Sequence, residues 1–401
     1  MVNSYFLKDG QYFDHDKGEF RNGDIFIIDG KISLNGSSQN DEMKTINCRD
    51  KFIVPGFFDC HVHLNWSGSS NPIDDTIKDG SHGAIIRAYR NSMKSLASGI
   101  TNLVDVGSFE DVAVKLAGMI NRGVIFGPDI LAAGRILCIT GGHGAGMGYE
   151  INGPAEALSA TRTLIKKGAD LIKIAATSGA YGDTGAEKLD SYQMNEDEIR
   201  TVTSEAHKFF IKVTAHALNS VGIHNSLVNG VDVIQHGAFL NKEDAAFMSK
   251  NNRSLVPTLY VYRKLAQGGP GVMEKAVEKS RMVVENHNEA FATAMKAGVN
   301  IASGTDAGSP NLGDHPTLIE EVITMHELGM SETNCIRAMT INAARAFGVQ
   351  DLYGSVENGK KANLVLLNSN PLENVRNLHD VKGVIKSGRF LQKNDILSSI
   401  I

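Results

Sequence analysis

The chain of 401 residues contains only four cysteines, and they lie far apart in the sequence. They are Cys48, Cys60, Cys138 and Cys335, which form no Cys-X-X-Cys pair and no spacing typical of a disulfide framework. This pattern argues against a small disulfide-rich secreted domain and favours a reducing compartment.

The sequence also lacks the features of a membrane protein or a nucleic-acid-binding protein. No apolar run approaches the roughly 18 residues of a membrane-spanning helix, and the N-terminal residues are too charged for a secretion signal. The 45 acidic residues outnumber the 40 basic ones, and no basic run or arginine-rich stripe occurs. We therefore expect a cytoplasmic protein that acts on a small molecule, without a membrane or a nucleic acid as partner. Assembly of identical chains into a homo-oligomer is compatible with the sequence.

What the sequence does contain is a long alternation of strand-like and helix-like segments. Residues 1–55 resemble short strands separated by turns, but from Gly56 onward short apolar runs alternate with longer stretches of helical periodicity. We count eight strand-like units, which predicts an α/β fold with a TIM-like (β/α)8 barrel over residues 56–351. Strand-like segments rich in Val, Leu and Ile occur again after Leu352. We therefore predict that residues 1–55 and 352–401 pair into a small β-sandwich domain beside the barrel.

Two of the helix-like stretches carry clear end signals. In NEDEIRTVTSEAHKFF, Asn195 is a suitable N-cap and Glu198 stands at the capping-box position. The stretch VMEKAVEKSRMVVENHNEAFATAMKAG is charged on one side and closes with Gly298, a common helix stop. We expect both stretches to be helices.

Two histidines stand one residue apart in the apolar run FFDCHVHL. In an extended strand, the side chains of His61 and His63 point to the same face, together with that of Asp59. Burying that many polar groups without partners costs several kcal/mol. We therefore expect a ligand to satisfy this face, and a metal ion is the obvious candidate. Cys60 points the other way, as a small core residue.

Further polar residues fall within or at the ends of other predicted barrel strands, where the active sites of such barrels lie. They are Lys173 in DLIKIAA, His216 in KVTAHA, His236 in DVIQHG and Asp306 in NIASGTDAG. Neutral imidazoles suit zinc and similar divalent ions, and a carboxylate completes the set. Each residue alone has an ordinary explanation as a hydrogen-bonded core histidine, a lysine that reaches solvent or an aspartate that caps a helix. Their order and placement together favour a metal site.

Lys173 is the unusual member of this set. An ammonium group in a buried apolar strand is costly and would repel a metal ion, so its charge must be removed. A neutral lysine amine can capture carbon dioxide and become a carbamate, an anion able to bridge two metal ions. We therefore expect Lys173 to be a ligand in this form.

The segments PGFFDCHVHL, GADLIKIAA, KVTAHA, VIQHG and GTDAG, in this order, resemble those of the amidohydrolase superfamily of metal-dependent hydrolases. The resemblance covers nearly the whole chain, including the stretch GSVENGKKANLVLLNSNPL. It implies the binuclear subtype with a carboxylated lysine and two divalent metal ions, and zinc is the expected metal. Carried over by position, one ion would be held by His61, His63 and Asp306, the other by His216 and His236, and both by the carbamate of Lys173.

A finer resemblance concerns ITGGHG, GADLIK and VPTLYVY, which are similar to segments of the branch of Xaa-Pro dipeptidases and imidazolonepropionase-related enzymes. It implies that His143 and Tyr262 contact the carbonyl or carboxylate of a substrate. Two positions depart from the family pattern. SGAYGDTG, after Lys173, could reshape the substrate pocket, and Asn363 stands in KKANLVLL where relatives usually carry Asp.

These assignments predict hydrolysis of an amide bond in a dipeptide or an N-acyl amino acid, as by an Xaa-Pro dipeptidase or a carboxypeptidase-like enzyme. The nucleophile would be a hydroxide that bridges the two metal ions. Asp306 would take its proton and return it to the leaving amine, while His143 would stabilise the oxyanion.

Three alternatives compete with this prediction. A cyclic amide or lactone hydrolase on the same metal pair stays open, because ring or chain preference depends on loop shape. A deaminase of the superfamily is disfavoured, since such relatives use one metal ion and lack the lysine. A non-catalytic scaffold is disfavoured as well, because all six expected metal ligands are present.

Overall fold

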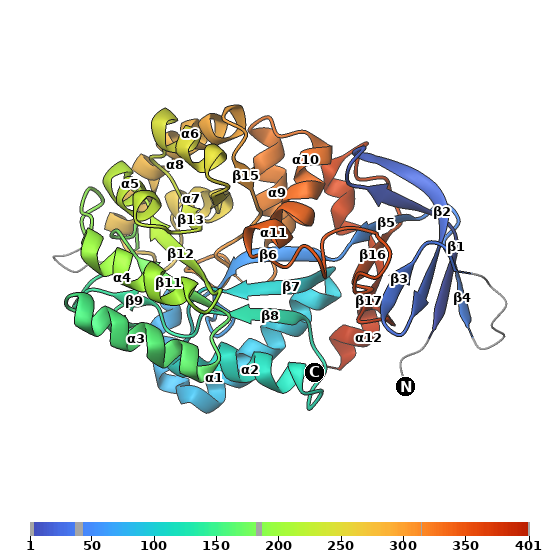
Figure 1. Ribbon diagram of the computed structural model, residues 1–401, viewed down its shortest axis with the longest axis horizontal. Coiled ribbons are helices and arrows are strands. Elements are labelled where there is room, and N and C mark those ends of the chain that lie inside the picture. The colour runs from blue at the N-terminus through green and yellow to red at the C-terminus, as the bar shows by residue number, and fades with distance from the viewer. Residues whose placement is uncertain (1–3, 37–42, 182–186, 314, 400–401) are drawn as a thin grey trace.

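In the computed structural model, which describes residues 4–36, 43–181, 187–313 and 315–399, parallel strands form the centre of the larger part of the molecule (Figure 1). Hydrogen bonds join these strands in two sheets, one from β6 to β8 and one that includes β11 to β15. The strands are β6 (Phe57–Val62), β7 (Ile100–Asp105), β8 (Asp129–Ala132), β11 (Leu171–Ala175), β12 (Lys212–Ala217), β13 (Val233–His236), β14 (Ser254–Val256) and β15 (Asn300–Ile301). Two short strands, β9 (Leu137–Cys138) and β10 (Tyr149–Glu150), lie beside β11.

Backbone hydrogen bonds connect the two sheets into a barrel. The N–H of Cys60 in β6 donates to the carbonyl of Ser303, just after β15, at 2.9 Å. On the other side, the N–H of Asp170 donates to the carbonyl of Ala132 in β8 at 2.9 Å. The predicted (β/α)8 barrel is therefore confirmed.

Helices cover the outside of this barrel (Figure 1). The two predicted end signals are confirmed: Asn195 and Glu198 form a reciprocal capping box at the start of α4, and α8 ends two residues before Gly298. The helices are α1 (Pro72–Ala97), α2 (Val112–Asn121), α3 (Pro154–Lys167), α4 (Glu196–His207), α5 (Ser220–Val228), α6 (Lys242–Lys250), α7 (Leu259–Ala266), α8 (Glu274–Lys296), α9 (Leu318–Glu327), α10 (Glu332–Ala338), α11 (Ile341–Ala346) and α12 (Lys393–Ser398).

The two ends of the chain together form a separate sheet, visible as blue and red strands side by side in Figure 1. Its order is β18-β17-β16-β5-β1-β2-β3, and β4 also pairs with β1. The strands are β1 (Tyr5–Asp14), β2 (Glu19–Ile28), β3 (Lys31–Ser33), β4 (Lys44–Asn47), β5 (Phe52–Pro55), β16 (Leu364–Leu367), β17 (Val381–Lys386) and β18 (Arg389–Gln392). Leu7, Ile25, Ile53, Leu364 and Ile385, from both ends of the chain, share one apolar core. The predicted small β domain beside the barrel is therefore present.

Asn363 lies where this sheet meets the barrel, and its surroundings explain why an amide suits the position. Its Nδ2 donates to Oδ2 of Asp129 at 2.9 Å, and its Oδ1 accepts from the N–H of Ser387 at 2.9 Å. Lys386 completes the cluster, with its Nζ 3.1 Å from the same carboxylate oxygen of Asp129. An aspartate at position 363 would turn a donor toward Asp129 into a second carboxylate.

We predict that Asn363→Asp lowers the free energy of unfolding by about 1–3 kcal/mol, because a partly buried hydrogen bond is replaced by two facing carboxylates. Urea unfolding of the purified protein measures this change. Asn368→Asp is the matched control, since the Nδ2 of Asn368 donates to Asp380 at 2.8 Å in a solvent-exposed hydrogen bond. There we expect a change within about 0.5 kcal/mol. Equal losses in the two variants would contradict this reasoning.

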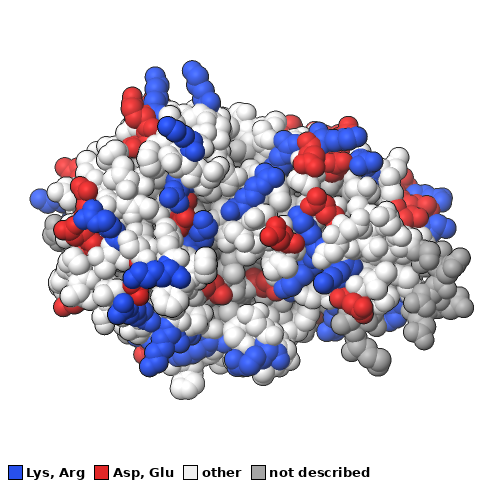
Figure 2. All heavy atoms as spheres, in the orientation of Figure 1, with Lys and Arg blue, Asp and Glu red and all other residues white. Residues whose placement is uncertain are grey.

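The surface carries charges of both signs. On the face shown in Figure 2, lysine and arginine side chains are interspersed with aspartate and glutamate side chains. This mixture agrees with the small formal net charge of −5. Within the part of the chain that the structure describes, no helix combines the length and the apolar character needed to span a membrane.

Candidate active site

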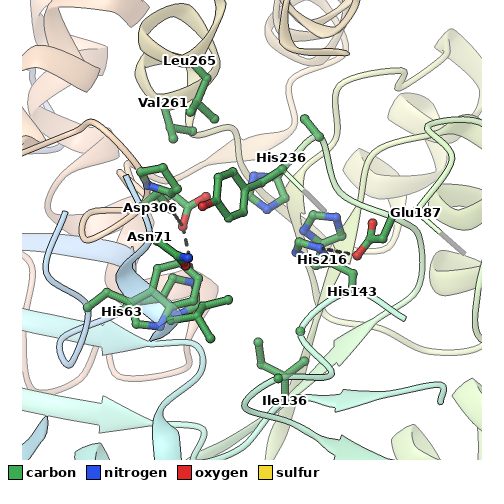
Figure 3. Close-up of a pocket in the computed structure, with 18 of the residues that line it drawn as sticks. His63, Asn71, Ile136, His143, Glu187, His216, His236, Val261, Leu265 and Asp306 are labelled. Carbon is green, nitrogen blue, oxygen red and sulfur yellow. Dashed lines mark hydrogen bonds and ion pairs between the residues drawn. The ribbon is translucent and has the colours of Figure 1, made fainter. Parts of the chain in front are cut away.

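A cavity of about 380 Å3 lies at the carboxyl ends of the barrel strands (Figure 3). Strand ends that are far apart in the sequence meet here because parallel strands of a barrel end at one rim. All eight predicted site residues line this cavity: His61, His63, His143, Lys173, His216, His236, Tyr262 and Asp306. Their proximity is established, and their individual roles stay predictions.

Four imidazole rings form the floor of the cavity. The ring centroids of His61 and His236 are 4.9 Å apart, and those of His216 and His236 are 4.6 Å apart. The rings of His61 and His63, on the same strand, are 5.5 Å apart. Burial is the main cause that lowers the pKa of each ring, to about 3 for His63 and well below the ordinary value for the others. The four imidazoles are therefore neutral at pH 7.

A chain of hydrogen bonds determines which nitrogen of His61 faces the cluster. The hydroxyl of Thr214 donates to the carbonyl of Val233 and accepts from Nε2 of Gln235. The Oε1 of Gln235 is thereby turned toward Nδ1 of His61, at 2.8 Å, and an amide oxygen can only accept. The proton of the neutral ring consequently resides on Nδ1, and Nε2 presents a lone pair.

Similar contacts orient the other rings. Nδ1 of His63 donates to the carbonyl of Gly107 at 2.8 Å, and Nε2 of His216 donates to the carbonyl of Ser178 at 3.0 Å. Nδ1 of His236 lies 2.7 Å from the hydroxyl of Thr258. Neutral rings that are oriented through one nitrogen and present a lone pair on the other have the form in which histidine binds metal ions.

Asp306 follows the last barrel strand and reaches toward this cluster. Its backbone adopts a left-handed conformation, with φ of 59°, and its N–H donates to the carbonyl of His61 at 2.7 Å. Its Oδ1 accepts from the hydroxyl of Ser309 at 2.9 Å and lies 3.5 Å from Nε2 of His61. Ligand atoms of His61, His236 and Asp306 all lie within 4.8 Å of one another. One cation could therefore contact all three residues.

Lys173 is buried in the middle of β11, with 2% of its surface exposed. Its Nζ has no hydrogen-bond partner among the residues that the structure describes. Burial lowers its pKa, whereas the carboxylate of Asp306 acts in the opposite direction. An amine without a partner beside four neutral imidazoles and a carboxylate fits a site that is completed by cations and by a modification of the amine.

Asp59 does not line the cavity, and its carboxylate has a partner within the chain. Its Oδ2 accepts from the hydroxyl of Thr305 at 2.7 Å, and its Oδ1 accepts from the N–H of Thr305 at 3.0 Å. Its carboxylate therefore connects β6 to the loop after β15 and needs no metal ion. Strand periodicity alone could not reveal this partner, which is 246 residues away in the sequence.

His143, which lies in a loop, and Tyr262, which lies on helix α7, border the cluster of imidazoles. The ring of His143 stacks on that of His216, with centroids 4.0 Å apart, and its Nδ1 lies 3.3 Å from Oε1 of Glu187 (Figure 3). Tyr262, on α7, packs its ring against His236 with centroids 5.5 Å apart. Both side chains are thus placed to meet a molecule bound over the cluster.

Trp66 and Glu187 line the cavity, and Gln235 and His287 contact histidines of the cluster, but the sequence pattern predicted none of these four residues. Gln235 could have been found, since an amide beside His236 in an otherwise apolar strand needs a buried partner. Glu187, Trp66 and His287 carried no such signal, because only the fold brings them to the site. Trp66 stacks on His63 with ring centroids 4.0 Å apart, and Nε2 of His287 lies 3.0 Å from the carbonyl of His236. The apolar part of the cavity wall is formed by Trp66, Ile73, Ile136, Val261, Leu265 and Met273.

Comparison with known proteins gives matches over most of the chain. Residues 52–391 match the model described as the amidohydrolase family. Ochratoxinase of Aspergillus niger is 28% identical, over 91% of this chain and 81% of its own length. Imidazolonepropionase of Rhizobium rhizogenes is 26% identical, over 86% of each chain. A solved structure of an Xaa-Pro dipeptidase with methionine bound in the active site is 30% identical, with a TM-score of 0.89 over 97% of this chain and 100% of that one.

Proposed function

Because the chain belongs to the amidohydrolase family, we propose that it hydrolyses an amide bond in a dipeptide or an N-acyl amino acid with the help of two divalent cations, zinc being the expected metal. One observation carries this proposal: four neutral imidazoles, one carboxylate and one amine that has no hydrogen-bond partner among the described residues meet in a single cavity. Nitrogen ligands together with a carboxylate suit zinc.

The chain offers two groups of ligands for such cations. We assign His61, His63 and Asp306 to one cation and His216 and His236 to the other. Lys173 would bridge both after its neutral amine attacks carbon dioxide, which forms an N–C bond and releases one proton. Burial supports this step, since it favours the neutral form of the amine.

Cations bound there would lower the pKa of water toward about 7 and polarise the scissile carbonyl. The residues of the chain supply the remaining steps. Asp306 takes a proton from the attacking water and delivers it to the leaving amine nitrogen. His143 donates a hydrogen bond to the carbonyl oxygen as negative charge develops on it, and Tyr262 contacts the same part of the substrate. The apolar wall excludes bulk water from the reacting groups.

The cavity and the relatives support a small amino-acid-derived substrate. A volume of about 380 Å3 is in the range of small-molecule sites, and the apolar wall suits an apolar side chain. The similar Xaa-Pro dipeptidase holds the amino acid methionine in its active site. The similarity to imidazolonepropionase keeps hydrolysis of a cyclic amide as the second candidate, on the same residues.

We predict that the protein binds about two zinc ions per chain, and that a chelator abolishes its hydrolysis of amides until metal and bicarbonate are restored. Elemental analysis, with a screen of dipeptides, N-acyl amino acids and cyclic amides, measures both properties. His61→Asn should lower the metal content. The control His207→Asn should leave the metal content unchanged, because His207 is the last residue of α4, pairs with Asp232 and lies outside the cavity. Full activity of metal-free protein would refute the proposal.

A further inference from the structure

We propose that Glu187 and Gly179 position the ring of His143 for the reaction, an inference that rests on the function proposed above. His143 belongs to the glycine-rich segment ITGGHG, where a side chain would ordinarily move freely. To contact a developing oxyanion, the ring must instead be held in place, because a displacement of about 1 Å can lower the rate roughly a hundredfold. The surroundings of the ring resolve this conflict.

The carboxylate of Glu187 holds one edge of the ring. Glu187 is buried, with 4% of its surface exposed, and its Oε1 lies 3.3 Å from Nδ1 of His143 (Figure 3). Its Oε2 accepts from the N–H of Gly179 at 2.7 Å, and its backbone carbonyl accepts from Nζ of Lys279 at 2.6 Å. Glu187 is thus itself held in place. It leaves Nε2 of His143 as the nitrogen available to a molecule in the cavity, where Nε2 donates a hydrogen bond when the ring carries a proton on both nitrogens.

Gly179 lies against one side of the ring, with no side chain between them. A Cβ atom at this position would lie 2.4 Å from both Nδ1 and Cε1 of His143, which is a severe clash. The φ angle of Gly179 is outside the left-handed region, so its backbone conformation is open to other residues. The ring of His143, rather than the backbone, therefore requires a glycine here.

Two further contacts complete the placement of His143. Its backbone N–H donates to Oε1 of Gln193 at 2.9 Å, and its ring stacks on His216. Gln193 therefore holds the backbone of His143, Glu187 holds one edge of its ring, and Gly179 and His216 lie against the ring.

SGAYGDTG is the segment that departs from the family pattern, and its first two residues contact the histidines of the site. Ser178 orients His216 through its carbonyl, and Gly179 makes room for His143. Residues 182–185 of this segment lie outside the described part of the chain. Ser178 and Gly179, at the beginning of the segment, therefore help to place the ring that is proposed to contact the substrate.

Double-mutant kinetics test this proposal on the zinc-loaded full-length protein. We expect Glu187→Gln to lower kcat roughly tenfold or more with little change in KM, since the contact to His143 matters most in the transition state. In the background of His143→Ala, the same substitution should change kcat less than about twofold. Glu198→Gln is the matched control: Glu198 is equally buried and accepts from the N–H of Gly153 at 2.7 Å, outside the cavity. It should leave kcat unchanged in both backgrounds.

Gly179→Ala provides a second test that does not depend on removing a charge. We expect it to lower kcat to the level of His143→Ala, and to cost nothing further once His143 is alanine, because the clash is then gone. A crystal structure of Gly179→Ala should show the ring displaced from its 4.0 Å stack on His216.

The outcomes separate this inference from the proposed function. Equal losses of kcat from Glu187→Gln in both backgrounds, or an unmoved His143 ring in Gly179→Ala, would overturn the positioning role. Absence of metal-dependent amide hydrolysis in the wild-type protein would instead overturn the proposed function, while the crystal structure still reports on the ring.

Discussion

Asp306→Asn is expected to lower turnover by roughly a hundredfold to ten-thousandfold while the protein retains most of its metal. Asparagine keeps the size of the side chain, and its Oδ1 can still accept from the hydroxyl of Ser309. It cannot take a proton from water or return one to the leaving amine. The proposed mechanism gives both tasks to this one carboxylate, so the loss falls mainly on kcat. Steady-state kinetics and elemental analysis of the same preparation measure the two quantities.

Asp244→Asn is the matched control for this experiment. Asp244 is also a buried aspartate beside an imidazole, with its Oδ1 2.8 Å from Nδ1 of His224, but it lies on α6 away from the cavity. Its replacement should change turnover less than about threefold, a margin that allows for a modest loss of stability. Turnover of Asp306→Asn close to that of the wild type would exclude Asp306 as the proton carrier.

Lys173→Met is expected to have opposite effects on function and on the stability of the metal-free protein. Loss of the amine removes the ligand proposed to be shared by the two cations, so the metal content should fall below two per chain and turnover should fall by roughly a thousandfold or more. Methionine fills similar space without a polar atom that needs a partner. The metal-free variant should therefore unfold with a free energy about 1–3 kcal/mol higher than the metal-free wild type.

The gain in stability should depend on pH with a definite sign. Burial lowers the pKa of Lys173, so the unfolded chain binds a proton that the folded chain releases. Folding must therefore release this proton, which opposes folding at neutral pH, and the opposition disappears as the pH rises past the ordinary lysine pKa of about 10.4. The advantage of Lys173→Met should accordingly shrink as the pH rises. Denaturant unfolding of metal-free protein at several pH values measures it.

Lys386→Met serves as the control because Lys386 is a buried lysine that has a partner, with its Nζ 3.1 Å from Oδ2 of Asp129. Its replacement removes the nearer of the two lysines that pair with this carboxylate, leaving Lys361 at 3.9 Å, and should destabilise the protein. Stabilisation of the metal-free protein by both substitutions, or by neither, would contradict the assignment of Lys173 as an amine that awaits a ligand.

The barrel was predictable from the sequence because its determinants are local. Apolar runs of strand length, helical periodicity and signals such as the capping box of Asn195 and Glu198 act over a few residues. The meeting of His61, Lys173, His216 and Asp306 followed from the same pattern, since the carboxyl ends of parallel strands share one rim. Pairing of the two chain ends was predictable as well, because both are strand-rich and flank the barrel segment.

Tertiary structure alone decided how each of these groups is oriented. Asp59 and His61 follow the same period of two in one strand, yet Asp59 is satisfied by Thr305 and His61 lines the cavity. The nitrogen that each imidazole presents depends on acceptors such as Ser178 and Gln235, and the placement of His143 depends on Glu187. Hydrogen bonds of this kind join residues that are distant in the chain and act only over about 3 Å. The linear order of residues therefore determined which chemical groups reach the rim, and packing of the folded chain determined where each proton and lone pair points.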